Sequence, residues 1–120
     1  MAQEPVITSL SNFQSVRDLF NGSIHMIILK LGADWCEPCK AIGPTVKEWF
    51  EKMPSHIRCC ELDVDANFEL YGYFRNKKIV KGIPALLCYM VDNDDGYPDD
   101  FYSGGDVNRV NMFFERCISK

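Results

Sequence analysis

Apolar residues form two kinds of pattern along this chain, a continuous run and a helical period, and each pattern predicts a type of element. His25–Leu31 is apolar on both faces apart from its end residues and Lys30, as in a central strand. Pro38–Lys52 has apolar residues at helical spacing and is predicted to be a helix. The same reading predicts strands at Pro5–Thr8, Arg58–Val64, Ala85–Val91 and Phe101–Ser103, and helices at Asn12–Phe20 (capped by Ser11), at Asn67–Phe74 and after a cap at Asp106. The residues of the last helix that are expected to face the core are Val110, Phe113, Phe114 and Cys117.

These elements follow the order β-α-β-α-β-α-β-β-α. The early alternation implies parallel strands, and the late pair of strands joined by a turn implies an antiparallel edge. Nothing resembles a linker or an internal repeat. We therefore predict an α/β fold with a central mixed five-stranded sheet flanked by four helices, in a single domain over residues 1–120.

Composition narrows the classes of function. The net charge is −4 with no basic cluster, which argues against a nucleic-acid-binding surface. The start of the chain, Met-Ala-Gln-Glu-Pro, has neither the basic nor the apolar segment of a signal peptide. The longest apolar run, around Met26–Leu31, is too short to cross a bilayer. We expect a cytoplasmic protein with no membrane or nucleic-acid partner.

Six cysteines carry the candidate chemistry. In a reducing compartment, a Cys-x-x-Cys such as Cys36-Glu37-Pro38-Cys39 is either catalytic or metal-binding. Cys36 falls between a predicted strand and a predicted helix, where the helix N-terminus favours the thiolate that attacks disulfides. The alternative, half of a zinc site, needs two more ligands at suitable spacing, and no second Cys-x-x-Cys exists. We predict no metal site.

The remaining four cysteines are expected to be small buried hydrophobic residues, with a regulatory disulfide or a dimer bridge as the alternative. Cys59 and Cys60 are adjacent on a predicted strand, so they should point to opposite faces of the sheet. Cys88 lies in another predicted strand and Cys117 on the last predicted helix.

Several motifs at consistent spacing resemble the thioredoxin family, from about Val6 to Ile118. They are Trp35-Cys36-Glu37-Pro38-Cys39-Lys40, which looks like its active site, Pro44 inside the second helix, Leu62-Asp63-Val64-Asp65, which resembles its third strand, Gly82-Ile83-Pro84, which looks like its cis-proline loop, and Gly104-Gly105 before the last helix.

The resemblance implies roles for these residues. Cys36 would be the nucleophile and Cys39 the resolving thiol, while Trp35, Glu37, Pro38, Ile83, Pro84 and Gly104 would form the substrate-binding surface. The Ile83 backbone would pair with an extended substrate segment. No bound cofactor is implied beyond the redox-active Cys36–Cys39 disulfide. Electrons would come from NADPH through a thioredoxin reductase, and the protein would be a monomer acting on disulfide-containing substrate proteins.

The chain departs from the family at the residues behind the active site. The family places an aspartate where this chain has Lys30, and tends to place a lysine where it has Glu61. We predict that Lys30 and Glu61 form a pair with swapped charges, in which Glu61 serves as the proton acceptor for Cys39. The alternative is that Lys30 extends to solvent and Glu61 is merely exposed. Gly32, where aromatic residues are usual, leaves space under the active site.

Glu37 is a further departure, because the family usually has glycine there. A carboxylate beside Cys36 should disfavour the thiolate of Cys36. The sequence therefore predicts a thioredoxin-like thiol–disulfide oxidoreductase that reduces disulfides in proteins. Two alternatives remain open: a protein-binding adaptor of the same fold with little or no redox activity, and a disulfide oxidase or isomerase.

Overall fold

The computed structural model describes residues 5–120, and its centre is a four-stranded mixed sheet. The strands are β1 (Met26–Gly32), β2 (Ile57–Asp63), β3 (Ala85–Met90) and β4 (Asp100–Ser103), in the spatial order β2-β1-β3-β4. The helices are α1 (Phe13–Arg17), α2 (Glu37–Lys52), α3 (Phe68–Asn76) and α4 (Val107–Ile118). The α/β class and the four flanking helices are confirmed.

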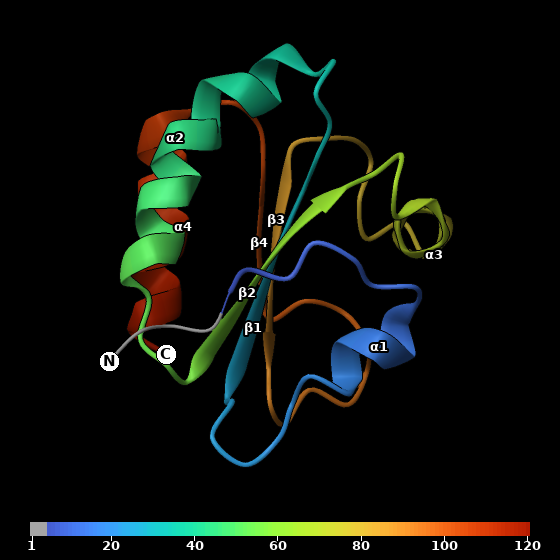
Figure 1. Cartoon of the computed structure of the whole chain (residues 1–120), viewed down its shortest axis with the longest axis vertical. Helices are drawn as coiled ribbons and strands as arrows, with labels where there is room; N and C mark the ends of the chain where they lie inside the picture. Colours follow the sequence, from blue (N-terminus) through green and yellow to red (C-terminus); the bar gives the residue numbers. More distant parts are fainter. Residues whose placement is uncertain (1–4) are drawn as a thin grey trace.

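The strand directions agree only in part with the sequence prediction. β1 and β2 are parallel, and β3 and β4 form the expected antiparallel edge, but β3 is also antiparallel to β1. Figure 1 shows the reason, because the nine-residue α3 lies beside the end of the sheet where β2 finishes. A helix in that place does not carry the chain back to the start of β2. The next strand therefore begins at the same end and runs in the opposite direction.

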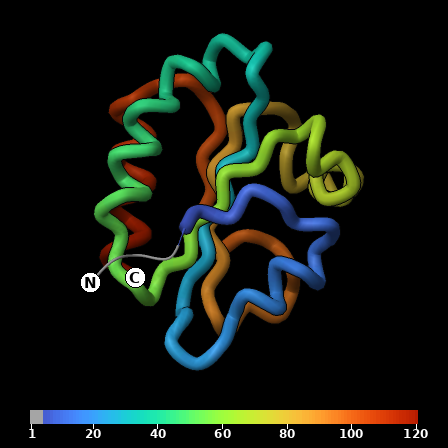
Figure 2. The backbone as a smooth tube through the Cα atoms, viewed as in Figure 1, coloured from blue at the N-terminus to red at the C-terminus, as the bar shows by residue number. Residues whose placement is uncertain are grey.

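Two layers of helices cover the sheet, one on each face (Figures 1 and 2). On one face, α1 and α3 pack through Val16, Leu70 and Phe74. On the other face, α2 and α4 pack side by side, and the Trp49 and Phe114 rings stack with centroids 5.3 Å apart. Every residue of β1 is buried, as the continuous apolar pattern predicts for a central strand.

The predicted strand at Pro5–Thr8 is reduced to a single bridge, so the prediction of five strands was wrong by one. Ile7 pairs with β2 by donating its N–H to the Cys59 carbonyl and accepting from the Glu61 N–H. Proline at the start of the segment has no N–H to offer. Beyond the bridge the chain turns toward α3, because the buried Asn67 side chain accepts a hydrogen bond from the Leu10 N–H and donates one to the Thr8 carbonyl.

Helix ends were predicted with mixed accuracy. The cap of α1 is Asn12 rather than Ser11, since the Asn12 side chain accepts from the Ser15 N–H, and this helix stops at Arg17, short of the predicted Phe20. Asp106 caps α4 as predicted. The residues predicted to face the core from α4 are all buried: Val110, Phe113, Phe114 and Cys117.

Candidate active site

Cys36 and Cys39 form a disulfide at the N-terminus of α2, directly after β1, with their Cα atoms 5.2 Å apart. Cys36 is the N-cap residue of this helix, and its Sγ accepts a hydrogen bond from the Cys39 N–H at 3.3 Å. Pro38 occupies the first turn, where its missing N–H costs no helical hydrogen bond. The sequence placed Cys36 at this helix terminus, and the structure confirms that position. Donors at a helix N-terminus stabilise a thiolate.

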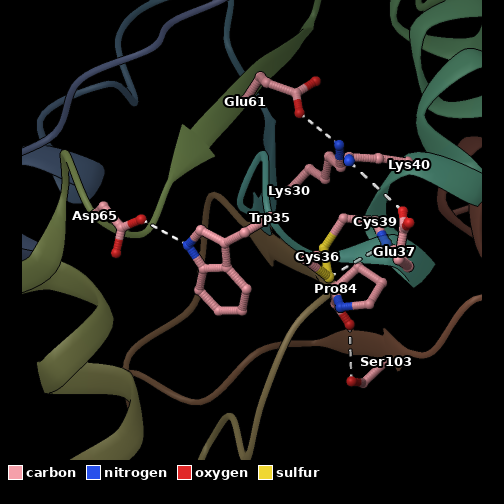
Figure 3. Close-up of a disulfide and its surroundings, with 10 residues drawn as sticks. All are labelled: Lys30, Trp35, Cys36, Glu37, Cys39, Lys40, Glu61, Asp65, Pro84 and Ser103. Carbon is pink, nitrogen blue, oxygen red and sulfur yellow. Dashed lines mark hydrogen bonds and ion pairs between the residues drawn. A yellow bond between two sulfur atoms is a disulfide. The ribbon is translucent and has the colours of Figure 1, made fainter.

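Trp35 stands exposed beside the disulfide, with 66% of its surface accessible (Figure 3). Its Nε1–H donates a hydrogen bond of 2.8 Å to the Asp65 carboxylate, which follows β2. This bond holds the exposed indole ring in one orientation. Trp35 therefore presents an oriented apolar face next to the two sulfur atoms.

The loop that carries Pro84 closes the site from the start of β3. The Ile83–Pro84 peptide bond is cis, and the Pro84 carbonyl accepts hydrogen bonds from the Ser103 hydroxyl at 2.8 Å and from the Gly104 N–H at 3.2 Å. Figure 3 shows Pro84 next to the disulfide in this view, with Ser103 of β4 below it. The predicted residues Ile83, Pro84 and Gly104 thus meet in one place with the cysteines.

The glycine pair before α4 fits closely against neighbouring residues. Gly104 has a φ of +144°, and a Cβ there would lie 2.6 Å from the Tyr102 hydroxyl oxygen. A Cβ on Gly105 would lie 3.1 Å from the Cβ of Pro38, inside the active-site turn. Both positions therefore favour glycine, and Gly105 brings the start of α4 into contact with α2.

Lys30 and Glu61 lie side by side on β1 and β2, and the Lys30 Nζ is 2.6 Å from the Glu61 Oε2 (Figure 3). The structure thus forms the predicted pair and excludes the alternative of a lysine that extends to solvent. The lysine side chain is only 8% exposed, whereas the Glu61 side chain is 43% exposed. That Glu61 accepts the proton of Cys39 stays a prediction.

Gly32 leaves space that both Lys30 and Cys39 border. The point where a Gly32 Cβ would stand lies 3.4 Å from the Cys39 Sγ and 3.6 Å from the Lys30 Cε. A cavity of about 670 Å³ opens here, and its walls include Lys30, Cys39 and Glu61. The sequence predicted the space but not what surrounds it.

Glu37 and Lys40 are both exposed at the start of α2, and their charged groups are 3.6 Å apart. Exposed pairs of this kind contribute little to stability. The ammonium group offsets part of the negative charge that Glu37 places near Cys36. The effect of Glu37 on the thiolate of Cys36 stays a prediction.

The other four cysteines are buried and not joined by disulfides, as predicted for small core residues. Cys59 and Cys60 face the two different core layers, and burial raises the pKa of each thiol to about 12. A hydrogen bond with Cys88, together with burial, raises the pKa of the Cys117 thiol still further. The Cys59, Cys60 and Cys117 thiols therefore hold almost no thiolate at neutral pH.

The structure of residues 5–120 also provides evidence on metal binding and on membrane-spanning helices. No group of three or more histidine, cysteine, aspartate or glutamate side chains in this part of the chain is arranged to hold a metal ion. No helix in the same part has the length and apolar character needed to cross a membrane.

Sequence reasoning missed the residues that hold the site residues in place. Asp65 and Ser103 hold Trp35 and Pro84 through hydrogen bonds, and Gly105 lies closely against Pro38. Asp65 and Gly105 were recognised only as parts of family motifs, and Ser103 only as the last residue of a strand. No sequence period links any of these pairs, because their partners lie on other elements.

Comparisons with known proteins agree with this geometry. The sequence profile of the family named Thioredoxin matches residues 5–111. The chain is 30% identical to thioredoxin 1 of Chlorobaculum tepidum over 64% of its length and 72% of that protein. It is 22% identical to thioredoxin 3 of Plasmodium falciparum over 98% of its length and 63% of that protein.

Solved structures give the same fold. The thioredoxin of Fasciola hepatica superposes with a TM-score of 0.71 and 22% identity, covering 92% of this chain and 98% of that one. Oxidised mitochondrial thioredoxin 3 of Saccharomyces cerevisiae superposes with a TM-score of 0.67 and 22% identity, covering 92% of this chain and 94% of that one.

The profile match over most of the chain shows that the protein belongs to the thioredoxin family. With the Cys36–Cys39 pair at the start of α2, it is a thiol–disulfide oxidoreductase.

Proposed function

We propose that this protein reduces disulfides in other proteins. The observation that carries the proposal is Cys36, which caps α2, accepts the Cys39 N–H and lies beside the exposed Trp35. In the reduced state this sulfur would be the more accessible thiolate, with a helix terminus to stabilise its charge. Trp35 and the Ile83–Pro84 loop would hold an extended substrate segment across it, with Glu37, Pro38 and Gly104 at the edges of the contact.

The reaction has two exchange steps. The Cys36 thiolate attacks a sulfur of the substrate disulfide and forms a mixed disulfide, while the other substrate sulfur leaves as a thiolate and takes a proton from water. Cys39 then loses its proton and attacks the Cys36 Sγ. The Cys36–Cys39 disulfide forms, the mixed disulfide breaks, and the second substrate sulfur leaves. The oxidised protein would be reduced again by a thioredoxin reductase with NADPH, acting on a cytoplasmic monomer without a bound cofactor.

Reduction of insulin disulfides, coupled to NADPH through a thioredoxin reductase, tests the proposal. Wild type should turn over, and Cys39→Ser should accumulate a mixed disulfide with the substrate that mass spectrometry detects. A reduction potential near about −270 mV would support a reductase, whereas one between about −180 and −120 mV would indicate an isomerase or oxidase. No turnover and no mixed disulfide with several reductases would instead favour the adaptor.

A further inference from the structure

The buried Lys30 has no part in the exchange steps described above. A lysine side chain that is 8% exposed is costly to desolvate, and the Glu61 carboxylate offsets that cost at 2.6 Å. A pair of apolar residues of similar size would often be as stable or more so. Stability alone therefore explains poorly why a charged pair links β1 to the neighbouring β2. This inference rests on the proposed function, because it assigns the pair a part in the second exchange step.

Lys30 and Cys39 face the same space. The Lys30 Cε and the Cys39 Sγ both lie within 3.6 Å of the point where a Gly32 Cβ would stand, and glycine leaves that point open. Both residues also line the cavity of about 670 Å³ behind the disulfide. The end of the Lys30 side chain and the Cys39 sulfur therefore border the same open point, and Coulomb interactions are stronger at such partly buried positions than in water.

The other charged groups around this cavity are less suited than Lys30 to stabilise a thiolate at Cys39. Its lining includes the carboxylates of Asp34, Glu61 and Asp63, and the ammonium of Lys40. Lys40 has a side chain that is 60% exposed and faces Glu37, so solvent screens its charge. Lys30 is the only cation on this wall, among the residues the structure describes, that is shielded from solvent.

We propose that the Lys30 ammonium, held in position by Glu61, favours the thiolate of Cys39 during the resolving step. The proton of Cys39 leaves to water in the cavity, and the thiolate forms beside a fixed positive charge. It then attacks the Cys36 Sγ, and the electron pair of the broken mixed disulfide leaves on the substrate sulfur. Glu61 is a positioning residue here, since it lies on the outer side of Lys30 and fixes where the ammonium stands.

This assignment and a general-base role for Glu61 predict opposite signs. A positive charge near a thiol favours the thiolate, and a negative charge opposes it. Removal of the Lys30 charge should therefore move the titration of Cys39 to higher pH. Removal of the Glu61 charge should move it to lower pH, because the lysine is then no longer neutralised. If Glu61 were the proton acceptor, Glu61→Gln would instead slow the resolving step.

The experiment compares Lys30→Met and Glu61→Gln with wild type in two measurements. The first is the titration of the Cys39 ¹³Cβ shift in the reduced protein by NMR. The second is the pH dependence of single-turnover reduction of a disulfide peptide by reduced protein. We expect the Cys39 midpoint to rise by roughly one pH unit in Lys30→Met, and to fall by less than that in Glu61→Gln. The rise of the single-turnover rate with pH should shift in the same directions.

Lys40→Met is the matched control, since it removes an exposed lysine from the same cavity wall and should leave the Cys39 midpoint near the wild-type value. An unchanged midpoint in folded Lys30→Met would overturn the proposal, as would a slower resolving step in Glu61→Gln. If Lys30→Met does not fold, the direction in which Glu61→Gln moves the Cys39 midpoint tests the proposal. The NMR titration needs no turnover, so its result stands apart from failure of the proposed reductase activity.

Discussion

The dithiol at the start of α2 and the four thiols of the core are all largely excluded from solvent, yet their surroundings differ. Cys36 is 6% exposed and Cys60 is 0% exposed, so burial alone does not separate the two groups. The Cys36 sulfur accepts a hydrogen bond from the N–H of Cys39 in the first turn of a helix. Cys60 lies within a paired strand, where the backbone N–H groups are used by the sheet.

The difference shows that local backbone donors, more than accessibility, decide which cysteine can react. A helix N-terminus leaves N–H groups without helical partners, and these stabilise a negative sulfur. β2 offers its cysteines no such helix terminus, and burial raises the pKa of the Cys59 and Cys60 thiols to about 12. The same residue type therefore serves as a candidate nucleophile at one place and as an apolar core residue at the other.

Alkylation of the reduced protein should give the largest contrast between the two groups. At pH 7, a thiol with a pKa of about 12 is ionised in only about one molecule in a hundred thousand. Iodoacetamide should therefore label Cys36 and leave Cys59 and Cys60 unlabelled until a denaturant is added. Peptide mass spectrometry gives the extent at each position. Labelling of Cys59 or Cys60 in native protein at a rate close to that of Cys36 would contradict the comparison.

A matched pair of serine variants should separate activity from packing. Cys36→Ser removes the proposed nucleophile and should lower insulin reduction by about a thousandfold or more, the scale seen when a covalent nucleophile is removed. Cys60→Ser makes the same chemical change in the core and should retain activity within about twofold while folded. Comparable losses in both variants, measured well below their melting temperatures, would mean that the core thiol takes part in the reaction.

A contrast between local and distant determinants also explains which features could be predicted from the sequence. The order of elements and the dithiol at a helix start depend on local signals: a continuous apolar strand, a helical period and a proline in the first turn. The burial of the residues facing the core from α4 was predicted because an amphipathic helix has only one face to bury.

The sequence predictions failed where contacts between residues far apart in the chain determine the structure. The single bridge at Ile7, in place of a strand, depends on the side chain of Asn67, far along the chain. The direction of β3 depends on where α3 lies, which no local period encodes. In the site, the bonds of Asp65 and Ser103 to their partners join separate elements, so no local pattern indicates either bond. Lys30 and Glu61 were paired only because the family resemblance places their strands together.

Substitution of the buried Cys60 should lower the stability of the fold. The Cys60 side chain has no solvent contact, and serine would bury a hydroxyl group in an apolar cluster. We expect Cys60→Ser to lower the free energy of unfolding by about 2 kcal/mol, since an unsatisfied buried polar group costs about 1–3 kcal/mol. Urea unfolding under reducing conditions measures it. Cys60→Ala, which buries no polar atom, should lose less, and an equal or larger loss in that variant would show that cavity formation dominates.

The smallest expected effect concerns the charges at the edge of the core thiols. Asp100 accepts two hydrogen bonds from Arg116, at 2.9 and 3.0 Å, and its carboxylate is 3.4 Å from the Lys120 Nζ. Burial alone would raise the pKa of Asp100, but the hydrogen bond and charge of Arg116, with lesser help from its neighbours, hold it below the ordinary value of 3.8. A carboxylate with a lowered pKa stabilises the fold above its unfolded pKa.

Asp100→Asn should therefore cost about 1 kcal/mol at pH 7, the upper range for a partly exposed pair with good geometry. The difference from wild type should be full above about pH 5 and shrink as the pH falls through the lowered value. Urea unfolding at pH 7 and pH 3 measures both, and Asp94→Asn, in the exposed loop before β4, is the control. A difference that stays constant down to pH 3 would mean that the introduced amide disturbs packing beside Cys117, and that the lost charge contributes little. In that case the ion pairs of Asp100 would contribute to local packing but little to the free energy of unfolding. The contrast between reactive and core thiols would then rest on the backbone donors.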